Sequence, residues 1–266
     1  MKTPISYYGG KQHLISEIIP LIPNHIQYVE PFCGGASIFW HKEKSEHEVI
    51  NDSNLAVYNF WNVCKNDFEK LKHKIENTLH SENEYIAARE IIKNEEINDK
   101  VMYAWAFWTS IALSFSNKLN GGFAFSNNGI HSQNTRKKRE SFESHIYERI
   151  KDVEIFNRDA IELILLKDTP DTFMYFDPPY PDTSCAHYQK TEEVFFRLIE
   201  ILPSLKCKWI LSSYLNDTLT NMRNEHNWQT KDIQKALRVS NNNQGKTKVE
   251  TLTWNYTFNG MNLKLF

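Results

Sequence analysis

Short apolar runs alternate with longer mixed segments near both ends of this chain, and several of the runs stop at a glycine or an acidic residue. Runs of this kind are typical of buried strands, and the mixed segments between them are typical of helices. Alternating strands and helices predict an α/β fold with a doubly wound, mostly parallel sheet. The predicted strands are 28–32, 48–51, 153–156, 172–176 and 208–213, and the predicted helices are 36–40, 159–166 and 191–202.

The middle and the tail of the chain follow different patterns. Two further strands, 236–240 and 249–256, flank an Asn-rich loop and predict an antiparallel C-terminal edge for the sheet. The middle contains charged helical segments from residue 55 to 96, an apolar helix at 101–115, a polar loop at 116–135 and a helix from 136 to 150. We therefore expect one α/β domain, made of residues 1–55 and 151–266, with residues 56–150 inserted as a helical domain.

Composition narrows the class of protein. The chain has 266 residues, 41% hydrophobic and 24% charged, which is ordinary for a globular protein. Its formal net charge of -2 excludes a wholly basic coat but not a local basic surface. The four cysteines are far apart, so neither a disulfide framework nor a cysteine zinc site is expected, and we predict no metal. With no secretory signal at the start and no apolar run of about 20 residues, we expect a cytoplasmic protein without a membrane partner.

A glycine turn and an acidic residue form the first candidate site. Gly34 and Gly35 follow the first predicted strand, where glycine lets a ligand approach the backbone and the N-terminus of the next helix. Asp52 ends the second strand, about 20 residues further on, where an acidic side chain can hold the two hydroxyls of a ribose. The alternatives are a plain tight turn and, for Asp52, the cap of a helix that begins at Ser53 or Asn54.

The tetrapeptide Asp177-Pro178-Pro179-Tyr180 forms the second candidate site, directly after the strand 172–176. Ligands of open α/β sheets bind outside the carboxyl ends of the strands. The two prolines fix the backbone, so the Pro178 carbonyl and the Asp177 carboxylate can act as paired acceptors beside the Tyr180 ring. Two acceptors and a flat ring suit an aromatic exocyclic amine. A rigid surface turn is the alternative.

In the order of these motifs, the chain resembles the Dam-type (D12 class, alpha group) DNA adenine N6-methyltransferases. The matching segments are Tyr7-Tyr8-Gly9-Gly10-Lys11, residues 29–35, residues 50–54, Asn157-Arg158-Asp159-Ala160, the tetrapeptide at 177–180, residues 209–213, and the tail segments 237–239 and 250–252. The resemblance implies the fold of class I S-adenosylmethionine-dependent methyltransferases, S-adenosylmethionine as methyl donor, and S-adenosylhomocysteine as product.

The resemblance also implies roles for individual residues. Tyr7, in place of the usual Trp, would pack against the cofactor, and Lys11 would pair with its methionine carboxylate. Asp52 would hold the ribose, and Asp159 would accept the adenine amino group of the cofactor. The cofactor-binding set is Tyr7, Lys11, Glu30, Phe32, Gly34, Asp52, Asp159 and Asp177, and the catalytic set is Asp177, Pro178, Pro179 and Tyr180.

Sequence recognition is expected in the helical insertion, with double-stranded DNA as partner. Side chains that can contact phosphates or base edges lie in a basic run and before a Gly-Gly turn. The candidate DNA-binding residues are Arg136, Lys137, Lys138 and Arg139 in the run, and Lys118 and Asn120 before the turn. A solvated helix start is the alternative. The target base would be flipped out of the duplex onto Tyr180.

The same motifs also fit other activities. The same tetrapeptide pattern also serves methyl transfer to cytosine N4 in DNA, to adenine in RNA, or to a glutamine side chain. Asp at its first position and the insertion before it favour adenine in DNA. A catalytically silent DNA-binding regulator is the alternative from a different class. The resemblance also suggests a bacterial or phage protein in a restriction-modification system, with a cognate restriction endonuclease that acts separately.

Overall fold

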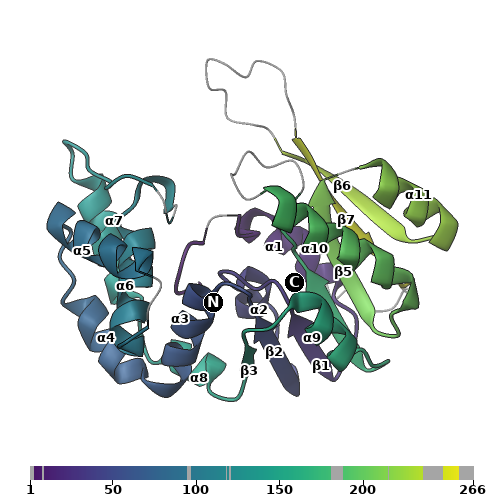
Figure 1. The fold of residues 1–266 in the computed structure, drawn as a ribbon, viewed down its shortest axis with the longest axis horizontal. Helices are drawn as coiled ribbons and strands as arrows, with labels where there is room; N and C mark the ends of the chain where they lie inside the picture. The colour runs from purple at the N-terminus through teal and green to yellow at the C-terminus, as the bar shows by residue number, and fades with distance from the viewer. Residues whose placement is uncertain are drawn as a thin grey trace. The chain divides into compact units, whose positions relative to one another are not determined.

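The structure is a computed structural model, and it describes residues 3–7, 9–94, 97–117, 119, 121–180, 188–214, 216–235 and 248–257. The described residues form a seven-stranded sheet with the order β3-β2-β1-β4-β5-β7-β6 (Figure 1). The strands are β1 (Gln27–Glu30), β2 (His47–Asn51), β3 (Glu154–Phe156), β4 (Thr172–Phe176), β5 (Lys208–Tyr214), β6 (Gln229–Lys235) and β7 (Lys248–Trp254).

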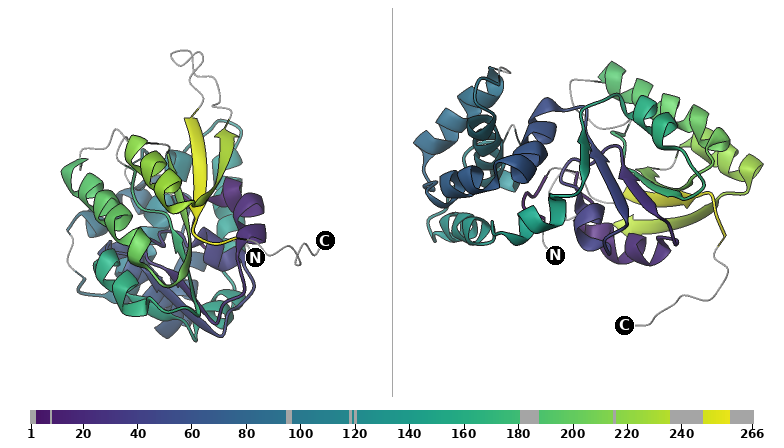
Figure 2. Two further views of the ribbon diagram at one scale, coloured as in Figure 1. Left: turned by 90° about the vertical axis from the view of Figure 1, so that its right-hand side faces the viewer. Right: turned by 90° about the horizontal axis from the view of Figure 1, so that it is seen from below.

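Strand direction confirms the predicted α/β architecture. β2 and β3 are parallel, and β4 is parallel to both β1 and β5. β7 is antiparallel to β5 and to β6, so the C-terminal edge is antiparallel as expected (Figure 2). β4 is buried along its whole length, which explains its continuous apolar run, since parallel strands are covered on both faces.

The chain divides into two compact units. Unit 1 contains Met1–Ile15, Cys33–Glu43 and Val49–Arg158, and unit 2 contains Ser16–Phe32, Lys44–Glu48 and Asp159–Phe266. The division of roles expected from the sequence, with recognition in residues 56–150, stays a prediction.

Unit 1 is mainly helical, and its core is aromatic. The apolar helix α6 (Lys100–Ala112) packs against α3, α4 and α5 (Figure 1). It buries Phe107 and Trp108. These aromatic residues therefore belong to the core. The helices of this unit are α2 (Ser37–His41), α3 (Leu55–Asn66), α4 (Phe68–Glu76), α5 (Glu82–Lys93), α6, α7 (Ile130–Glu140) and α8 (His145–Ile150).

The helices of unit 2 connect the strands of the sheet. α10 follows β4 with an amphipathic pattern that buries Phe195 and Leu198. The helices are α1 (Ile15–Ile18), which begins at the end of unit 1, α9 (Ala160–Lys167), α10 (Tyr188–Ile201) and α11 (Asp217–His226). Short 3-10 turns occur at Gln12–Leu14, Ile19–Leu21, Phe115–Asn117 and Leu202–Ser204.

Two local predictions were wrong, and two elements were missed. A helix begins at Ile130, inside the expected loop 116–135, and the chain from 136 to 150 forms two helices, α7 and α8. α11 and β6 were missed, because their segments are polar and lack a clear apolar period. The strand expected at 236–240 lies outside the described residues. Within the described part of the chain, every helix is too short or too polar to cross a bilayer.

Candidate functional site

The glycine turn after β1 has a backbone that requires glycine. Gly34 has φ of 45°, in the left-handed region, and a Cβ built there would lie 2.9 Å from Cδ1 of Tyr7. Ala36 also has a left-handed backbone, directly before α2. The Trp61 indole donates to the Gly34 carbonyl at 2.9 Å. The turn is therefore held in one conformation by neighbours on both sides, as a close ligand approach would need.

Asp52 binds the glycine turn from the end of β2. Its Oδ2 accepts the Gly34 N–H at 2.8 Å, and its Oδ1 accepts the Asn54 N–H at 2.8 Å. Burial raises the pKa of Asp52, and these two N–H donors act in the opposite direction. The helix-cap alternative is wrong, because Asn54 caps α3 by accepting from Ala56 and Val57. Each carboxylate oxygen keeps a second lone pair for a ligand hydroxyl.

The segment before α1 packs onto the same turn. The Tyr7 side chain would contact a Cβ at Gly34 or at Gly35, and its ring centroid lies 6.0 Å from that of Phe107. Burial, then the charge of Asp52, raise the pKa of Tyr7. Lys11 is buried, and its Nζ donates to the Gly9 carbonyl at 3.2 Å. Unit 1 thus brings Tyr7, Gly34 and Asp52 together, and their predicted roles toward the cofactor stay a prediction.

In unit 2, the tetrapeptide continues directly from β4. Pro178 is buried and Pro179 is exposed, while Asp177 is half-buried. The Tyr180 hydroxyl donates to Oδ1 of Asp177 at 3.1 Å, and its ring centroid is 4.6 Å from that of Tyr214. Tyr180 is only 7% exposed, so a base can stack on it only if the ring or its neighbours move.

Glu250 of β7 is a polar neighbour that sequence reasoning did not assign. Its Oε1 lies 3.2 Å from the Tyr180 hydroxyl, and only 4% of the residue is exposed. Burial, then the charges of Asp177 and Glu250, raise the pKa of Tyr180 well above its usual range. The signal was present in the strand alternation, since Glu250 shares a face with Leu252 and Trp254. A charged residue on an apolar strand face needs a buried partner.

Glu30, at the end of β1, is also a buried carboxylate. The Tyr28 hydroxyl donates to its Oε2 at 2.8 Å. Burial, then the charge of Glu30, raise the pKa of Tyr28 well above its usual range. Phe32, two residues further on, is half-buried. Both residues were predicted to contact the cofactor, and that role stays a prediction.

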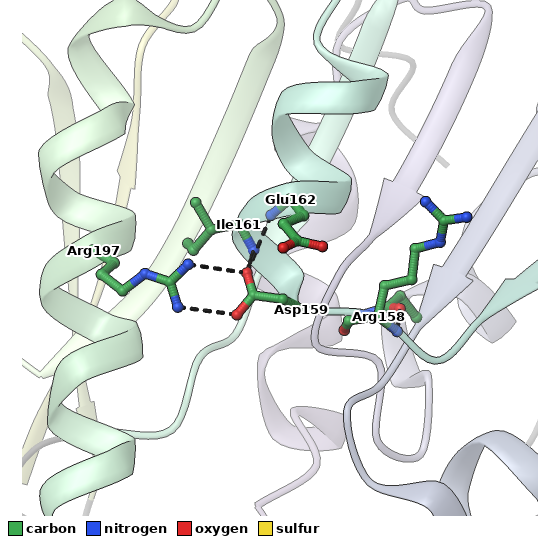
Figure 3. A network of polar contacts seen from close by, with 6 residues as sticks. Arg158, Asp159, Ile161, Glu162 and Arg197 are labelled. Carbon is green, nitrogen blue, oxygen red and sulfur yellow. Dashed lines mark hydrogen bonds and ion pairs between the residues drawn. The ribbon is translucent and has the colours of Figure 1, made fainter.

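Asp159 is held by an arginine that the sequence did not single out. Arg197 of α10 donates to both carboxylate oxygens, at 2.9 Å and 3.2 Å, and the same carboxylate caps α9 (Figure 3). Partial burial acts to raise the pKa of Asp159, but the Arg197 hydrogen bond and the helix N–H donors outweigh it and lower that pKa. A cofactor amine would therefore share this carboxylate with Arg197.

The basic run on α7 separates into two pairs. Lys138 Nζ donates to the Ala112 carbonyl and to Asn117 Oδ1, and burial lowers its pKa to about 8. Arg139 donates to the Thr78 carbonyl at 2.7 Å. Arg136 and Lys137 are exposed, with Arg136 3.6 Å from Glu140. Of the four side chains, only those of Arg136 and Lys137 are exposed to solvent, as a contact with a DNA phosphate requires. Lys118 and Asn120 lie outside the described residues.

The chain is similar in sequence to known proteins. A family model for D12 class N6 adenine-specific DNA methyltransferases matches residues 7–238. Modification methylase StsI of Streptococcus sanguinis is 24% identical over 299 residues, which cover 99% of this chain and 45% of that protein. Type II methyltransferase M.FokI of Planomicrobium okeanokoites is 22% identical, covering 97% of this chain and 43% of that protein.

A third relative matches a shorter part of the chain. The DNA N-6-adenine-methyltransferase of Escherichia phage P1 is 26% identical over 102 residues, which cover 37% of this chain and 13% of that protein. The chain thus spans less than half the length of each of these three relatives.

Proposed function

The chain belongs to the D12 class N6 adenine-specific DNA methyltransferase family, and on that premise we propose that it transfers a methyl group from S-adenosylmethionine to the N6 amino group of adenine in duplex DNA. The observation that carries this proposal is the tetrapeptide after the buried strand β4. There a half-buried Asp177 carboxylate, oriented by the Tyr180 hydroxyl, is followed by two prolines.

The chemistry asks for paired hydrogen-bond acceptors. The adenine amine is a poor nucleophile, because its lone pair is delocalised into the ring. When Asp177 and the Pro178 carbonyl each accept one N–H, the amine is drawn out of conjugation with the ring, and its lone pair localises on the nitrogen and faces the methyl donor. Transfer by in-line displacement then depends on positioning and electrostatics. The nitrogen forms a bond to the methyl carbon and loses one proton, and S-adenosylhomocysteine leaves.

The unit 1 residues fit the cofactor chemically. The backbone at Gly34 has no room for a Cβ, and Asp52 beside it offers acceptors for ribose hydroxyls. S-adenosylmethionine supplies the activated methyl group when bound. We propose that Tyr7 packs against it, that Lys11 pairs with its methionine carboxylate, and that Glu30 and Phe32 also contact it. Asp159 would accept its adenine amine, beside Arg197.

The DNA contacts proposed here are Arg136 and Lys137, which are the exposed pair of the basic run. Lys118 and Asn120 stay in the proposal on their sequence positions alone. The target base must leave the duplex to be methylated. Stacking on Tyr180 can be tested with 2-aminopurine at the target position. Tyr180→Ala should reduce the fluorescence change on binding, whereas an unchanged signal argues against stacking.

Tritium transfer from labelled S-adenosylmethionine tests the activity itself. The protein is offered duplex DNA, RNA and protein substrates, and the labelled product is digested and identified. We expect N6-methyldeoxyadenosine from DNA. N4-methylcytosine, labelled RNA or labelled glutamine would assign one of the other amines. A folded protein that binds DNA but transfers no label would be a silent regulator.

A restriction endonuclease that acts separately is the proposed partner. Its support is the names of two relatives, a modification methylase and a Type II methyltransferase. DNA methylated by this protein should resist that endonuclease in a cleavage assay, and cleavage at the unmethylated rate would contradict the pairing. We place the protein in the cytoplasm, where such DNA would be its substrate.

A further inference from the structure

The Tyr180 hydroxyl lies between two carboxylates. It is 3.1 Å from Oδ1 of Asp177 and 3.2 Å from Oε1 of Glu250. A phenol has one proton to donate. It can therefore make one good hydrogen bond to a carboxylate, and the second carboxylate stays at contact distance as an alternative acceptor.

The topology of the sheet places Glu250 there. β7 runs antiparallel to β5, so residues near its start lie beside the end of β5, where Glu250 pairs with Tyr214. The Tyr214 ring in turn contacts Tyr180, which follows the end of the parallel strand β4. If β7 ran parallel to β5, its third residue, Glu250, would lie near the other end of the sheet. The antiparallel edge is thus what brings a carboxylate next to the tetrapeptide.

Burial of the Glu250 carboxylate close to Asp177 carries a desolvation cost. Glu250 is 4% exposed, and a buried carboxylate beside another one favours uptake of a proton by the pair. Among the described residues, Tyr214 on β5 pairs with Glu250 in the sheet, and Tyr175, Asp177 and Glu30 belong to the same electrostatic cluster. On the β6 side, the residue that pairs with Glu250 is the apolar Ile233.

We propose that Glu250 is a positioning residue that makes Asp177 a better temporary base. This inference rests on the proposed methyl transfer. When the methylated amine gives its proton to Asp177, that carboxyl accepts hydrogen bonds less well, and the Tyr180 hydroxyl turns to Glu250. The negative charge of Glu250 favours the proton on Asp177, which later passes to water. The amine proton thus passes to Asp177 and then to water, and no covalent bond of Glu250 forms or breaks.

The test is the single-turnover rate of methyl transfer to adenine as a function of pH. In Glu250→Gln the charge is lost while the shape is kept. We expect the rate near neutral pH to fall roughly 10-fold or more, and the acid limb of the profile to move to lower pH by about one unit. Binding of S-adenosylhomocysteine and of DNA should stay unchanged. Glu250→Asp keeps the charge and should keep the position of the acid limb.

A control removes a different buried hydroxyl, from the strand β4 that precedes the tetrapeptide. Tyr175→Phe deletes the hydroxyl that contacts Ser212 at 2.8 Å, and it should leave the acid limb in place. If Glu250→Gln methylates at the wild-type rate with an unmoved profile, the inference is overturned while the proposed function stands. If the wild type transfers no methyl group to adenine, the proposed function fails instead. Should Glu250→Gln not fold, Glu250→Leu, which also removes the charge, is measured in its place, and an unmoved acid limb in that variant would overturn the inference.

Discussion

Arg197 and Asp159 form a two-point ion pair, in which the guanidinium donates to both carboxylate oxygens at 2.9 Å and 3.2 Å (Figure 3). The pair joins α10 to the N-cap of α9, and it holds the side chain that the family resemblance assigns to the cofactor adenine. Because the two side chains are 40% and 33% exposed, solvent screens the pair, and its energetic effect is modest.

Arg197→Gln should lower the free energy of unfolding by less than about 1 kcal/mol at pH 7. The pKa of Asp159 is lowered in the folded state, so its contribution is present above its unfolded pKa and is lost as pH falls through the folded value. The difference between variant and wild type in urea unfolding should therefore vanish in acid. Arg158→Gln, at an exposed arginine whose guanidinium lies over the Phe156 ring, is the control. A difference that does not shrink as the pH falls would contradict the ion-pair explanation.

Gly34→Ala should disrupt the glycine turn. The new Cβ would meet the Tyr7 ring at 2.9 Å, and alanine disfavours a φ of 45°. We expect a loss of about 1–2 kcal/mol in stability from the backbone alone, and weaker binding of S-adenosylhomocysteine by calorimetry. Gly122→Ala is the matched control, because a Cβ there meets nothing within 4 Å. Equal effects of the two substitutions would mean that the Gly34 conformation has no special role.

Asp177→Ala should abolish methyl transfer while leaving the fold intact. Loss of one preorganised acceptor typically costs about 10²–10³ in rate, and here the same group also receives the amine proton. Asp171→Ala removes an exposed aspartate one residue before the same strand, β4, and should keep full activity. Circular dichroism checks the fold of both variants. Near-wild-type turnover of Asp177→Ala would remove this residue from the mechanism.

The two halves of the basic run should behave differently. Changing Arg136 and Lys137 to Gln should reduce the salt dependence of DNA binding, by a slope of about 2 if each contacts one phosphate. Changing Lys138 and Arg139 to Gln should lower stability instead, because their donors satisfy carbonyls within unit 1. Fluorescence anisotropy at several salt concentrations and thermal unfolding measure the two effects. An unaltered slope in the first variant would exclude these two side chains as phosphate contacts.

Local patterns were enough to predict much of the fold and part of the site. The apolar run of β4 and the glycine turn at Gly34 follow from short-range rules, which is why both were predicted within a residue or two. Partners distant in sequence were not predictable in this way. Glu250 meets Tyr180 across 70 residues, and nothing local to either identifies the other.

For the basic run at 136–139, the local pattern predicted more DNA contacts than the structure leaves available. Four consecutive cations look alike in sequence, but on a helix they point in different directions. Lys138 is directed at the end of α6 and Arg139 at the segment after α4, where carbonyls lack helical partners. Tertiary structure therefore decides which of the four remain available for DNA.

Sequencing of methylated DNA tests the central claim most directly. The protein and its Asp177→Ala variant are expressed separately in a host that lacks DNA methylation, and genomic DNA is analysed by single-molecule long-read sequencing and by mass spectrometry of its nucleosides. We expect N6-methyladenine at one recurring sequence with the wild-type protein, and none with the variant. Methylated cytosine in place of adenine, or adenine methylation that persists in the variant, would contradict adenine N6 methylation by this site.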